Sequence, residues 1–391
     1  MKCIYCNLNK EEKEFSLEHI FPTALGGKKL NDNLFKTRKV CRDCNSKMGL
    51  FVDALFLKSF FVKGSMSNDY LNYLDFNDDK STLPFIYLGK NESVTHSDYD
   101  YCDYWNWAGG SRIFHFHNNY FENFESLAGG NPIKHKNNKT AGEAYLVSST
   151  NNLIWIKKLL LSFKEHFKYA KRFSVNIAIQ NENNILNIPS TQQQSIINSI
   201  LQVSNGTQHN KKVLQSGFEV RFLAKMALAL GDNLLDTQYI CSNYARQLQN
   251  IIFEKDINKI ADFEPKISNF FQLKNENIFK LIAWKGGHTI LFLPIQNSLI
   301  LHLSLFGSEI PLLTTITDEL EKFDIDLVKK YPNGWVYIFI PQRGIFKGPY
   351  SFPAYIAYSQ GDKSFMEDLT DIENLYINFE DLPPFVVDQD E

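Results

Sequence analysis

Four of the six cysteines come in two closely spaced pairs, and these residues have the clearest chemistry in the chain. Two residues separate Cys3 from Cys6 and Cys41 from Cys44, and 34 residues lie between the pairs. Four thiolates from two such pairs can complete the tetrahedral shell of a Zn²⁺ ion. So short a segment also lacks the apolar residues to hold itself together without a cross-link. We therefore expect a structural zinc site formed by Cys3, Cys6, Cys41 and Cys44.

The segment between the cysteine pairs combines acidic, imidazole and amide side chains. It contains Glu18-His19-Ile20-Phe21-Pro22, then Gly26-Gly27, then Asn33, and the second pair continues as Asn45-Ser46-Lys47. These motifs, in this order, resemble the HNH endonucleases, and in particular a subgroup of bacterial proteins with a zinc knuckle. The resemblance is limited to about residues 1–60. It implies that this head of the chain has the ββα-metal fold.

The resemblance also implies a role for individual residues. In the HNH family an acid–histidine pair ends the first strand, an asparagine lies in the connecting loop, and a histidine or asparagine opens the helix. Glu18-His19, Asn33 and Asn45 occupy these places. His19 would then be the general base, Glu18 and Asn45 would bind the catalytic metal, and Asn33 would hold the loop and orient the imidazole. Asn31 is an alternative to Asn33 as the loop residue.

The hydrolysis of a phosphodiester bond requires these types of residue. The attacking water must lose a proton near neutral pH, and histidine has the pKa that suits this task. Charge that develops on the phosphate and on the 3′-oxygen leaving group requires a divalent cation, and hard oxygen ligands favour Mg²⁺ or Mn²⁺. Lys47 or Arg42 is expected to contact the phosphate. The sequence thus predicts a metal-dependent endonuclease that acts on DNA, in double-stranded form.

Two further groups of residues leave alternatives open. Asp53 lies eight residues after Asn45 on the same predicted helix, where it supports either the site or the contact between head and body. His115 and His117 are two residues apart in a predicted strand, and residues at this spacing share one face. This arrangement permits a metal pair, but the sequence offers no acidic or cysteine third ligand. We therefore favour a polar strand face for the two histidines.

The net charge of the chain hides a strong difference between its regions. The whole chain has a formal charge of −3, which by itself argues against a nucleic-acid partner. Residues 1–50, however, contain ten basic and six acidic residues, whereas residues 362–391 contain one basic and ten acidic residues. Phosphate binding depends on local charge, because salt screens each charge beyond about 10 Å. The basic head is therefore compatible with DNA.

The elements that must position the site are expected to form an α+β fold. Apolar periodicity predicts helices over residues 47–63, 153–172, 217–230 and 238–253, the third ended by Gly231. Strands are predicted over residues 112–117, 143–148, 173–180 and 335–340. Four apolar runs separated by turn residues predict an antiparallel β-meander over residues 279–284, 289–294, 298–305 and 310–316.

We expect three segments: an HNH nuclease domain over 1–63, an α+β body over 64–361 and an acidic segment over 362–391. The body is expected to supply substrate grip, dimerisation or regulation by a protein or small ligand. The alternatives to a nuclease are a zinc-dependent nucleic-acid binding module with an idle site and an effector whose body senses a ligand or partner. Resemblance to bacterial HNH fusion proteins suggests defence against phage DNA. The sequence predicts neither an export signal nor a membrane span, so a cytoplasmic location is expected.

Overall fold

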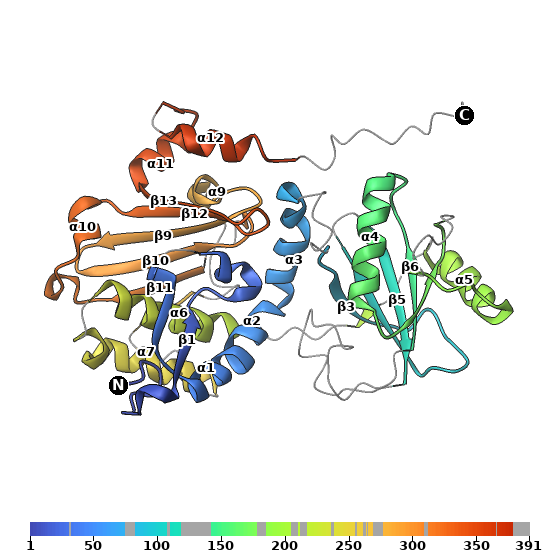
Figure 1. The fold of residues 1–391 in the computed structure, drawn as a ribbon, viewed down its shortest axis with the longest axis horizontal. Coiled ribbons are helices and arrows are strands. Elements are labelled where there is room, and N and C mark those ends of the chain that lie inside the picture. The colour runs from blue at the N-terminus through green and yellow to red at the C-terminus, as the bar shows by residue number, and fades with distance from the viewer. Residues whose placement is uncertain are drawn as a thin grey trace. The chain divides into compact units, whose positions relative to one another are not determined.

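The fold is described from a computed structural model of the chain (Figure 1). The structure describes residues 1–30, 33–74, 83–107, 110–118, 142–177, 185–204, 210–211, 217–235, 238–254, 256–260, 263, 265–268, 277–308, 312–364 and 366–377. Among these residues, no helix is long and apolar enough to cross a membrane.

The chain divides into two compact units. Unit 1 comprises Met1–Leu57 and Ser216–Tyr376, and unit 2 comprises Lys58–Gln215 and Ile377–Glu391. The boundaries expected after residues 63 and 361 follow changes in composition, whereas these units follow spatial contacts. The division into a nuclease domain, a body and an acidic segment stays a prediction.

The head of the chain, the first 57 residues, is a β-hairpin followed by a helix. The antiparallel strands β1 and β2 lead directly into α1, which continues through a π-helical segment into α2. This is the predicted ββα arrangement. Its elements are η1 (Glu12–Glu14), β1 (Phe15–His19), η2 (Thr23–Leu25), η3 (Gly27–Lys29), η4 (Asn33–Phe35), β2 (Lys36–Cys41), α1 (Arg42–Met48), the π-helix η5 (Gly49–Asp53) and α2 (Ala54–Leu57).

The rest of unit 1 is built on a five-stranded antiparallel sheet of order β11-β10-β9-β12-β13. Its strands are β9 (His288–Ile295), β10 (Ser298–Ser304), β11 (Leu312–Thr317), β12 (Trp335–Ile340) and β13 (Ile345–Ser351). β9 to β11 form the meander that the sequence predicts, and β12 pairs with β9. Residues 279–284 are not the expected first strand. They lie mostly in α9 (Asn277–Ile282), because a short apolar run has no periodicity that separates a buried strand from a helix.

Helix α6 (Phe218–Leu234) is the central helix of unit 1, and it packs beside α7 (Asn243–Phe253) and against β11 (Figure 1). The expected end at Gly231 is wrong, since the helix continues for another three residues. A Cβ atom at Gly231 would lie 2.3 Å from the ring of Tyr239, so this glycine makes room for an aromatic side chain. Remaining elements of unit 1 are η8 (Tyr239–Cys241), α8 (Ile257–Ile260), η9 (Leu320–Lys322), α10 (Asp326–Lys330), α11 (Phe352–Ser359) and α12 (Glu367–Glu373).

Aromatic side chains of the head pack into the core of unit 1. Phe21 lies edge-on to Phe339 of β12, and Phe56 stacks on Phe222 of α6 with ring centroids 3.8 Å apart. Phe35 makes an edge contact with Tyr337. All three head phenylalanines are fully buried, and burial of each stabilises the packing by about 1.5–3 kcal/mol. The head and the sheet of unit 1 therefore share one hydrophobic core.

Unit 2 is a six-stranded sheet of order β7-β6-β5-β4-β3-β8 with a helix on each face. Helix α4 packs on one face and α5 on the other (Figure 1). The elements are α3 (Phe60–Asp69), η6 (Tyr70–Tyr73), β3 (Ile86–Asn91), β4 (Tyr101–Asn106), β5 (Arg112–His117), β6 (Glu143–Val147), α4 (Leu153–His166), β7 (Lys171–Ser174), α5 (Thr191–Ser204) and β8 (Asn210–Lys211).

Two expected elements of unit 2 meet at a different boundary. The predicted helix over 153–172 ends at His166, where Phe167 leaves helical geometry with φ −116° and ψ 37°. The following turn brings Lys171–Ser174 alongside β6 as a parallel strand, so β7 begins earlier than the predicted strand over 173–180. Residues 178–180 lie outside the described residues.

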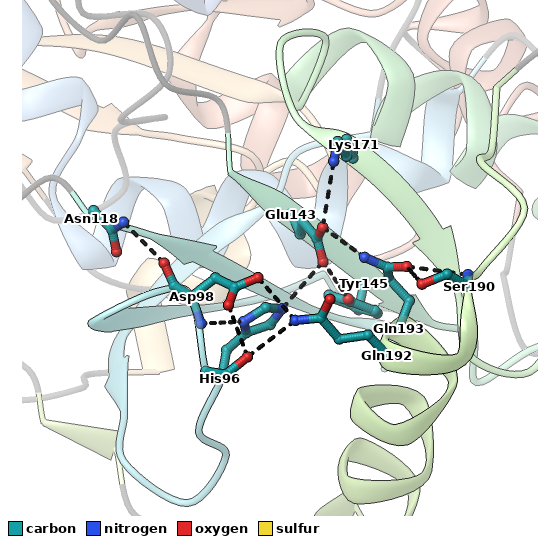
Figure 2. A network of polar contacts seen from close by, with 10 residues as sticks. His96, Asp98, Asn118, Glu143, Tyr145, Lys171, Ser190, Gln192 and Gln193 are labelled. Carbon is teal, nitrogen blue, oxygen red and sulfur yellow. Dashed lines mark hydrogen bonds and ion pairs between the residues drawn. The ribbon is translucent and has the colours of Figure 1, made fainter.

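A buried carboxylate fixes the start of α5 to the sheet of unit 2. Figure 2 shows His96, Tyr145 and Gln193 pointing toward the carboxylate of Glu143 at the start of β6. The Tyr145 hydroxyl donates to Oε2 at 2.6 Å, and the Gln193 amide donates to Oε1 at 3.0 Å. His96 Nε2 lies 3.3 Å from Oε2, while the backbone N–H of Asp98 donates to its Nδ1. Both ring nitrogens of His96 and both oxygens of Glu143 thus have partners.

Candidate nuclease and zinc site

The two cysteine pairs converge at one point of the head. The Sγ atoms of Cys3, Cys6, Cys41 and Cys44 all lie within 4.8 Å of one another, and three of the four residues are buried. In a tetrahedral zinc–thiolate site, bonds of about 2.3 Å place the sulfurs about 3.8 Å apart. The sulfur cluster therefore fits a Zn²⁺ ion in donor type, number and spacing, as the sequence predicts.

Backbone hydrogen bonds shape the first cysteine pair into a knuckle. The N–H of Cys3 donates to the Leu8 carbonyl, and Asn7 adopts a left-handed conformation with φ 60° to close the turn. The N–H of Cys41 points at Cys3 Sγ from 3.4 Å. The pKa of the Cys3 thiol lies below its ordinary value, first because of the hydrogen bond with Cys44 and then because of such backbone N–H groups, although burial opposes them. These hydrogen bonds favour a thiolate at Cys3, the form that binds metal, whereas burial raises the pKa of Cys6 and the hydrogen bond with Cys3 raises that of Cys44.

A bulge in β1 lies directly before the acid–histidine pair. The register between β1 and β2 shifts between Ser16 and Glu18, after which Glu18 pairs with Thr37 and His19 with Lys36. Bulges redirect side chains and are frequent beside active sites. As a result, the two neighbouring side chains have different surroundings: Glu18 is 3% exposed, whereas His19 is half-buried.

Glu18 belongs to a buried group of charges that links the head to α6. Lys225 is 0% exposed, and its Nζ lies 2.7 Å from Oε1 of Glu18 and 2.6 Å from Oδ2 of Asp53. The hydroxyl of Tyr5 also donates to Oε1 of Glu18, at 3.4 Å. Burial raises the pKa of both carboxyls and Lys225 opposes that rise, while the two carboxylates raise the pKa of Lys225 against the effect of its burial. Both contacts of Glu18 use Oε1, and Oε2 takes part in neither.

His19 stands in a positively charged setting that favours its neutral form. Its pKa is lowered, first by partial burial and then by the charge of Lys36, with smaller contributions from Lys28 and Lys225, although the backbone of Gly27 opposes this. The loop after His19 is held by close packing: Gly26 has φ 92°, and a Cβ there would lie 2.6 Å from the ring of Phe339. The imidazole is therefore available as a base at neutral pH.

Asn45 is held by its amide nitrogen at the bulge of β1. Its Nδ2 donates to the Leu17 carbonyl at 2.9 Å and to the Ser16 hydroxyl at 3.0 Å. Because a carbonyl only accepts, this contact fixes which end of the amide faces the strand. The Oδ1 oxygen of Asn45 is thereby directed away from the Leu17 carbonyl. The first turn of α1 is thus tied to the strand that ends in Glu18 and His19.

The remaining predicted site residues occupy the rim of the head. Asn33 opens η4, and its carbonyl accepts a hydrogen bond from Asn233 of α6 at 3.3 Å. Lys47 pairs with Asp43 at 2.9 Å on the solvent side of α1, and Arg42 is exposed at the start of that helix. Asn31, the alternative to Asn33, lies outside the described residues.

A basic cleft runs along β2 beside Asn33. It has a volume of about 680 Å³, and its wall includes Lys36, Arg38 and Lys39 from β2 together with Asn233 and Leu234 from α6. Lys39 forms an ion pair with the buried carboxylate of Asp232 at 3.0 Å, whereas Arg38 is exposed. Such a concentration of positive charge attracts phosphate groups. Lys47 and Arg42, which the sequence predicts as phosphate contacts, are not among the residues that line this cleft.

Lys225 and Asn233 of α6 contact the head in a way that the sequence does not predict. Lys225 interrupts the strongly apolar stretch of α6, and a lysine at such a position requires a buried counter-charge. That signal indicates an ion pair but does not identify the partner. Asp53 contacts α6 through Lys225, and the same lysine binds Glu18, so this carboxylate takes part in the contact between head and body beside a proposed site residue.

Comparison with known proteins agrees with this geometry for the head. Residues 3–61 match the model of a family described as HNH endonuclease. No curated protein matches the chain, and no solved structure matches it. The match includes the four cysteines, the acid–histidine pair and the helix that begins at Arg42. Over residues 3–61, the head of this chain therefore matches the HNH endonuclease family in both sequence and ββα arrangement.

Proposed function

We propose that this protein is a metal-dependent endonuclease that hydrolyses DNA phosphodiester bonds at its HNH domain, with His19 as the general base. The observation that supports this most is the hydrogen bond from Asn45 Nδ2 to the Leu17 carbonyl. It ties the start of α1 to the end of β1, where His19 and Glu18 lie. The residues that bind the metal and the residue that activates water thereby belong to one rigid hairpin–helix unit.

The residues that would hold a divalent metal ion are Glu18 and Asn45. Glu18 offers Oε2, because Lys225 and Tyr5 both bind Oε1, and Asn45 offers Oδ1. An all-oxygen donor set of this kind suits Mg²⁺ or Mn²⁺. When bound, the ion would neutralise charge on the phosphate and on the leaving 3′-oxygen. Lys225 holds the carboxylate of Glu18 in place and opposes the rise in its pKa that burial causes.

His19 supplies the base. Partial burial and the positive charge of Lys36 lower its pKa, so the imidazole is neutral at pH 7 and can take a proton from the attacking water at a ring nitrogen. Asn33, which opens η4 at the other end of the loop, is proposed to orient the imidazole. Arg42 and Lys47 at the exposed face of α1 are proposed to contact the phosphate backbone of the DNA, and the basic cleft along β2 extends that surface.

The test is cleavage of supercoiled plasmid with Mg²⁺ or Mn²⁺ by the wild type and by His19→Ala. Loss of a general base should lower the rate about 10²- to 10⁴-fold. A matched control is His166→Ala, because His166 is also a half-buried histidine but lies in α4 of unit 2. This control should cut like the wild type.

The outcomes separate the candidate functions. Equal cleavage by the wild type and His19→Ala, or no cleavage with any divalent metal, contradicts a nuclease that uses this base. DNA retention without cleavage identifies the binding module with an idle site. Cleavage that appears only after a ligand or partner is added identifies the regulated effector, the form in which a role in defence against phage DNA is proposed.

A further inference from the structure

Three potential metal ligands lie together on the sheet of unit 2, far in sequence from the HNH domain. Asp103 of β4 is directly opposite His115 of β5, and His117 follows two residues later on the same face. Their ligand atoms lie within 4.8 Å of one another, with Nε2 of His117 3.0 Å from Oδ2 of Asp103. The sequence showed the two histidines without a third ligand, and pairing with β4 supplies the missing carboxylate.

The three side chains are buried in an aromatic environment. Asp103 is 2%, His115 1% and His117 5% exposed. The rings of His115 and His117 stack with centroids 4.9 Å apart, and Phe167 lies against His115 at 5.5 Å. Two imidazoles and a carboxylate are costly to bury unless each polar atom has a partner. Among the described residues, Nδ1 of His117 has no hydrogen-bond partner, so the cluster is not fully satisfied by the protein around it.

A tyrosine orients the carboxylate toward the histidines. The hydroxyl of Tyr87, itself 1% exposed, donates to Oδ1 of Asp103 at 3.2 Å. This hydrogen bond directs Oδ2 to His117. Protein metal sites regularly include such a donor behind a carboxylate ligand, where it fixes the ligand's orientation.

The pair of His96 and Glu143 in the same unit provides the contrast. It is also a buried histidine beside a carboxylate, and a tyrosine likewise donates to that carboxylate. There, however, Gln193 occupies the second oxygen and the backbone of Asp98 occupies Nδ1 of the histidine (Figure 2). That network satisfies itself with hydrogen bonds. In the cluster, by contrast, the residue directly opposite Asp103 is a second histidine, His115.

We propose that Asp103, His115 and His117 bind a divalent transition-metal ion, with Zn²⁺ as the ion that fits best. Two imidazole nitrogens and one carboxylate oxygen form a donor set of intermediate softness, which suits Zn²⁺ better than Mg²⁺ or Ca²⁺. Zinc bonds of about 2.0–2.2 Å place neighbouring ligand atoms about 3.3 Å apart, close to the 3.0 Å between His117 and Asp103. Three protein ligands leave a fourth position for a water molecule. This site is independent of the proposed nuclease function.

The first test is the metal content of the full chain. The protein is stripped with a chelator, reloaded with Zn²⁺, freed of excess metal and measured by mass spectrometry. We expect about two zinc ions per chain, one at the four cysteines and one at this cluster. His117→Asn should retain about one zinc ion fewer. His96→Asn, which alters the hydrogen-bonded network around Glu143, should retain both zinc ions. Equal content in the wild type and His117→Asn would overturn the proposal.

The second test uses the wild type alone, so that it does not depend on how a variant folds. When the stripped protein is reloaded with Co²⁺, a bound imidazole gives strongly shifted, exchangeable N–H signals in the proton NMR spectrum, and the four-cysteine site cannot give them. Their absence from fully loaded protein would refute the site.

The third test addresses the tyrosine. Tyr87→Phe should weaken Zn²⁺ binding at the cluster about 10- to 100-fold, and Tyr145→Phe, which removes the equivalent hydroxyl from the Glu143 network, should leave it unchanged. No effect of Tyr87→Phe, or an equal effect of both variants, would refute a metal ion held by the oriented carboxylate of Asp103.

Discussion

Replacement of Lys225 by methionine tests whether a buried cation fastens the HNH domain to α6. Methionine keeps most of the length of the side chain and removes its charge. Each of the two contacts, at 2.7 and 2.6 Å, is a Coulomb attraction of about 6 kcal/mol at an effective dielectric constant of about 20, and desolvation of the three groups offsets much of this. Removal of only the cation leaves Glu18 and Asp53 buried without a counter-charge. We therefore expect a loss of about 3–5 kcal/mol in the free energy of unfolding of unit 1.

The loss should depend on pH in a definite direction. Burial already raises the pKa of Glu18 and Asp53, and without Lys225 their pKa values must rise further. The folded variant then binds more protons than the unfolded chain, so its stability falls as pH rises through the range between the unfolded and folded pKa values. Relative to the wild type, Lys225→Met should therefore recover stability as the pH is lowered toward 4.5.

The assay is urea unfolding followed by hydrogen–deuterium exchange at peptides of α6, which separates unit 1 from unit 2. Lys13→Met is the matched control, because Lys13 contacts Glu11 at the same 2.7 Å but both side chains are largely exposed. That variant should lose less than about 1 kcal/mol. A comparable small loss for Lys225→Met, or a large loss that does not change with pH, would refute a charged, buried connection. Asp53→Asn in the Lys225→Met background should restore part of the stability.

Four further predictions follow from the site and from the core. The acidic limb of the pH–rate profile should lie below pH 6.5, because burial and the charge of Lys36 lower the pKa of His19. Lys36→Met should therefore move that limb to higher pH. Arg38→Gln should weaken DNA binding and reduce the slope of log K against log salt by about 0.9, measured by fluorescence anisotropy. Cys44→Ser should lose about one zinc ion per chain and the protection of α1 from hydrogen exchange. Burial lowers the pKa of His302 to about 4. Between pH 6.5 and 4 the folded chain therefore binds fewer protons than the unfolded chain, and its stability falls as the pH is lowered. His302→Phe should remove this loss of about 1.4 kcal/mol per pH unit, measured by urea unfolding.

The features that the sequence predicts well are those encoded by neighbouring residues. The knuckle at Cys3 depends on a turn of a few residues, and the meander from β9 to β11 depends on apolar runs with turn residues between them. The order of strand, loop and helix in the head likewise follows from local motifs. For such features, the spacing of residues along the chain is enough to predict how they are arranged in space.

The features that it could not predict depend on contacts between distant residues. Lys225 reaches Asp53 across 172 positions, and nothing near either residue specifies the other. Asp103 completes a ligand set with His115 only because β4 and β5 pair in one particular register. The run over 279–284 became a helix rather than a strand for the same reason, since the surroundings of a short apolar segment decide its structure.

The order of the two units along the chain has a consequence for how the protein is made. The first segment of unit 1 ends at Leu57, and the chain returns to that unit only at Ser216. A ribosome that adds about 5–20 residues per second needs about 10–30 s to proceed from Asp53 to Lys225. During that interval the nascent zinc knuckle can bind its ion, but Lys225, the buried cation that pairs with Glu18, has not yet been synthesised. The head is thus translated first and assembled late, after most of unit 2 has left the ribosome.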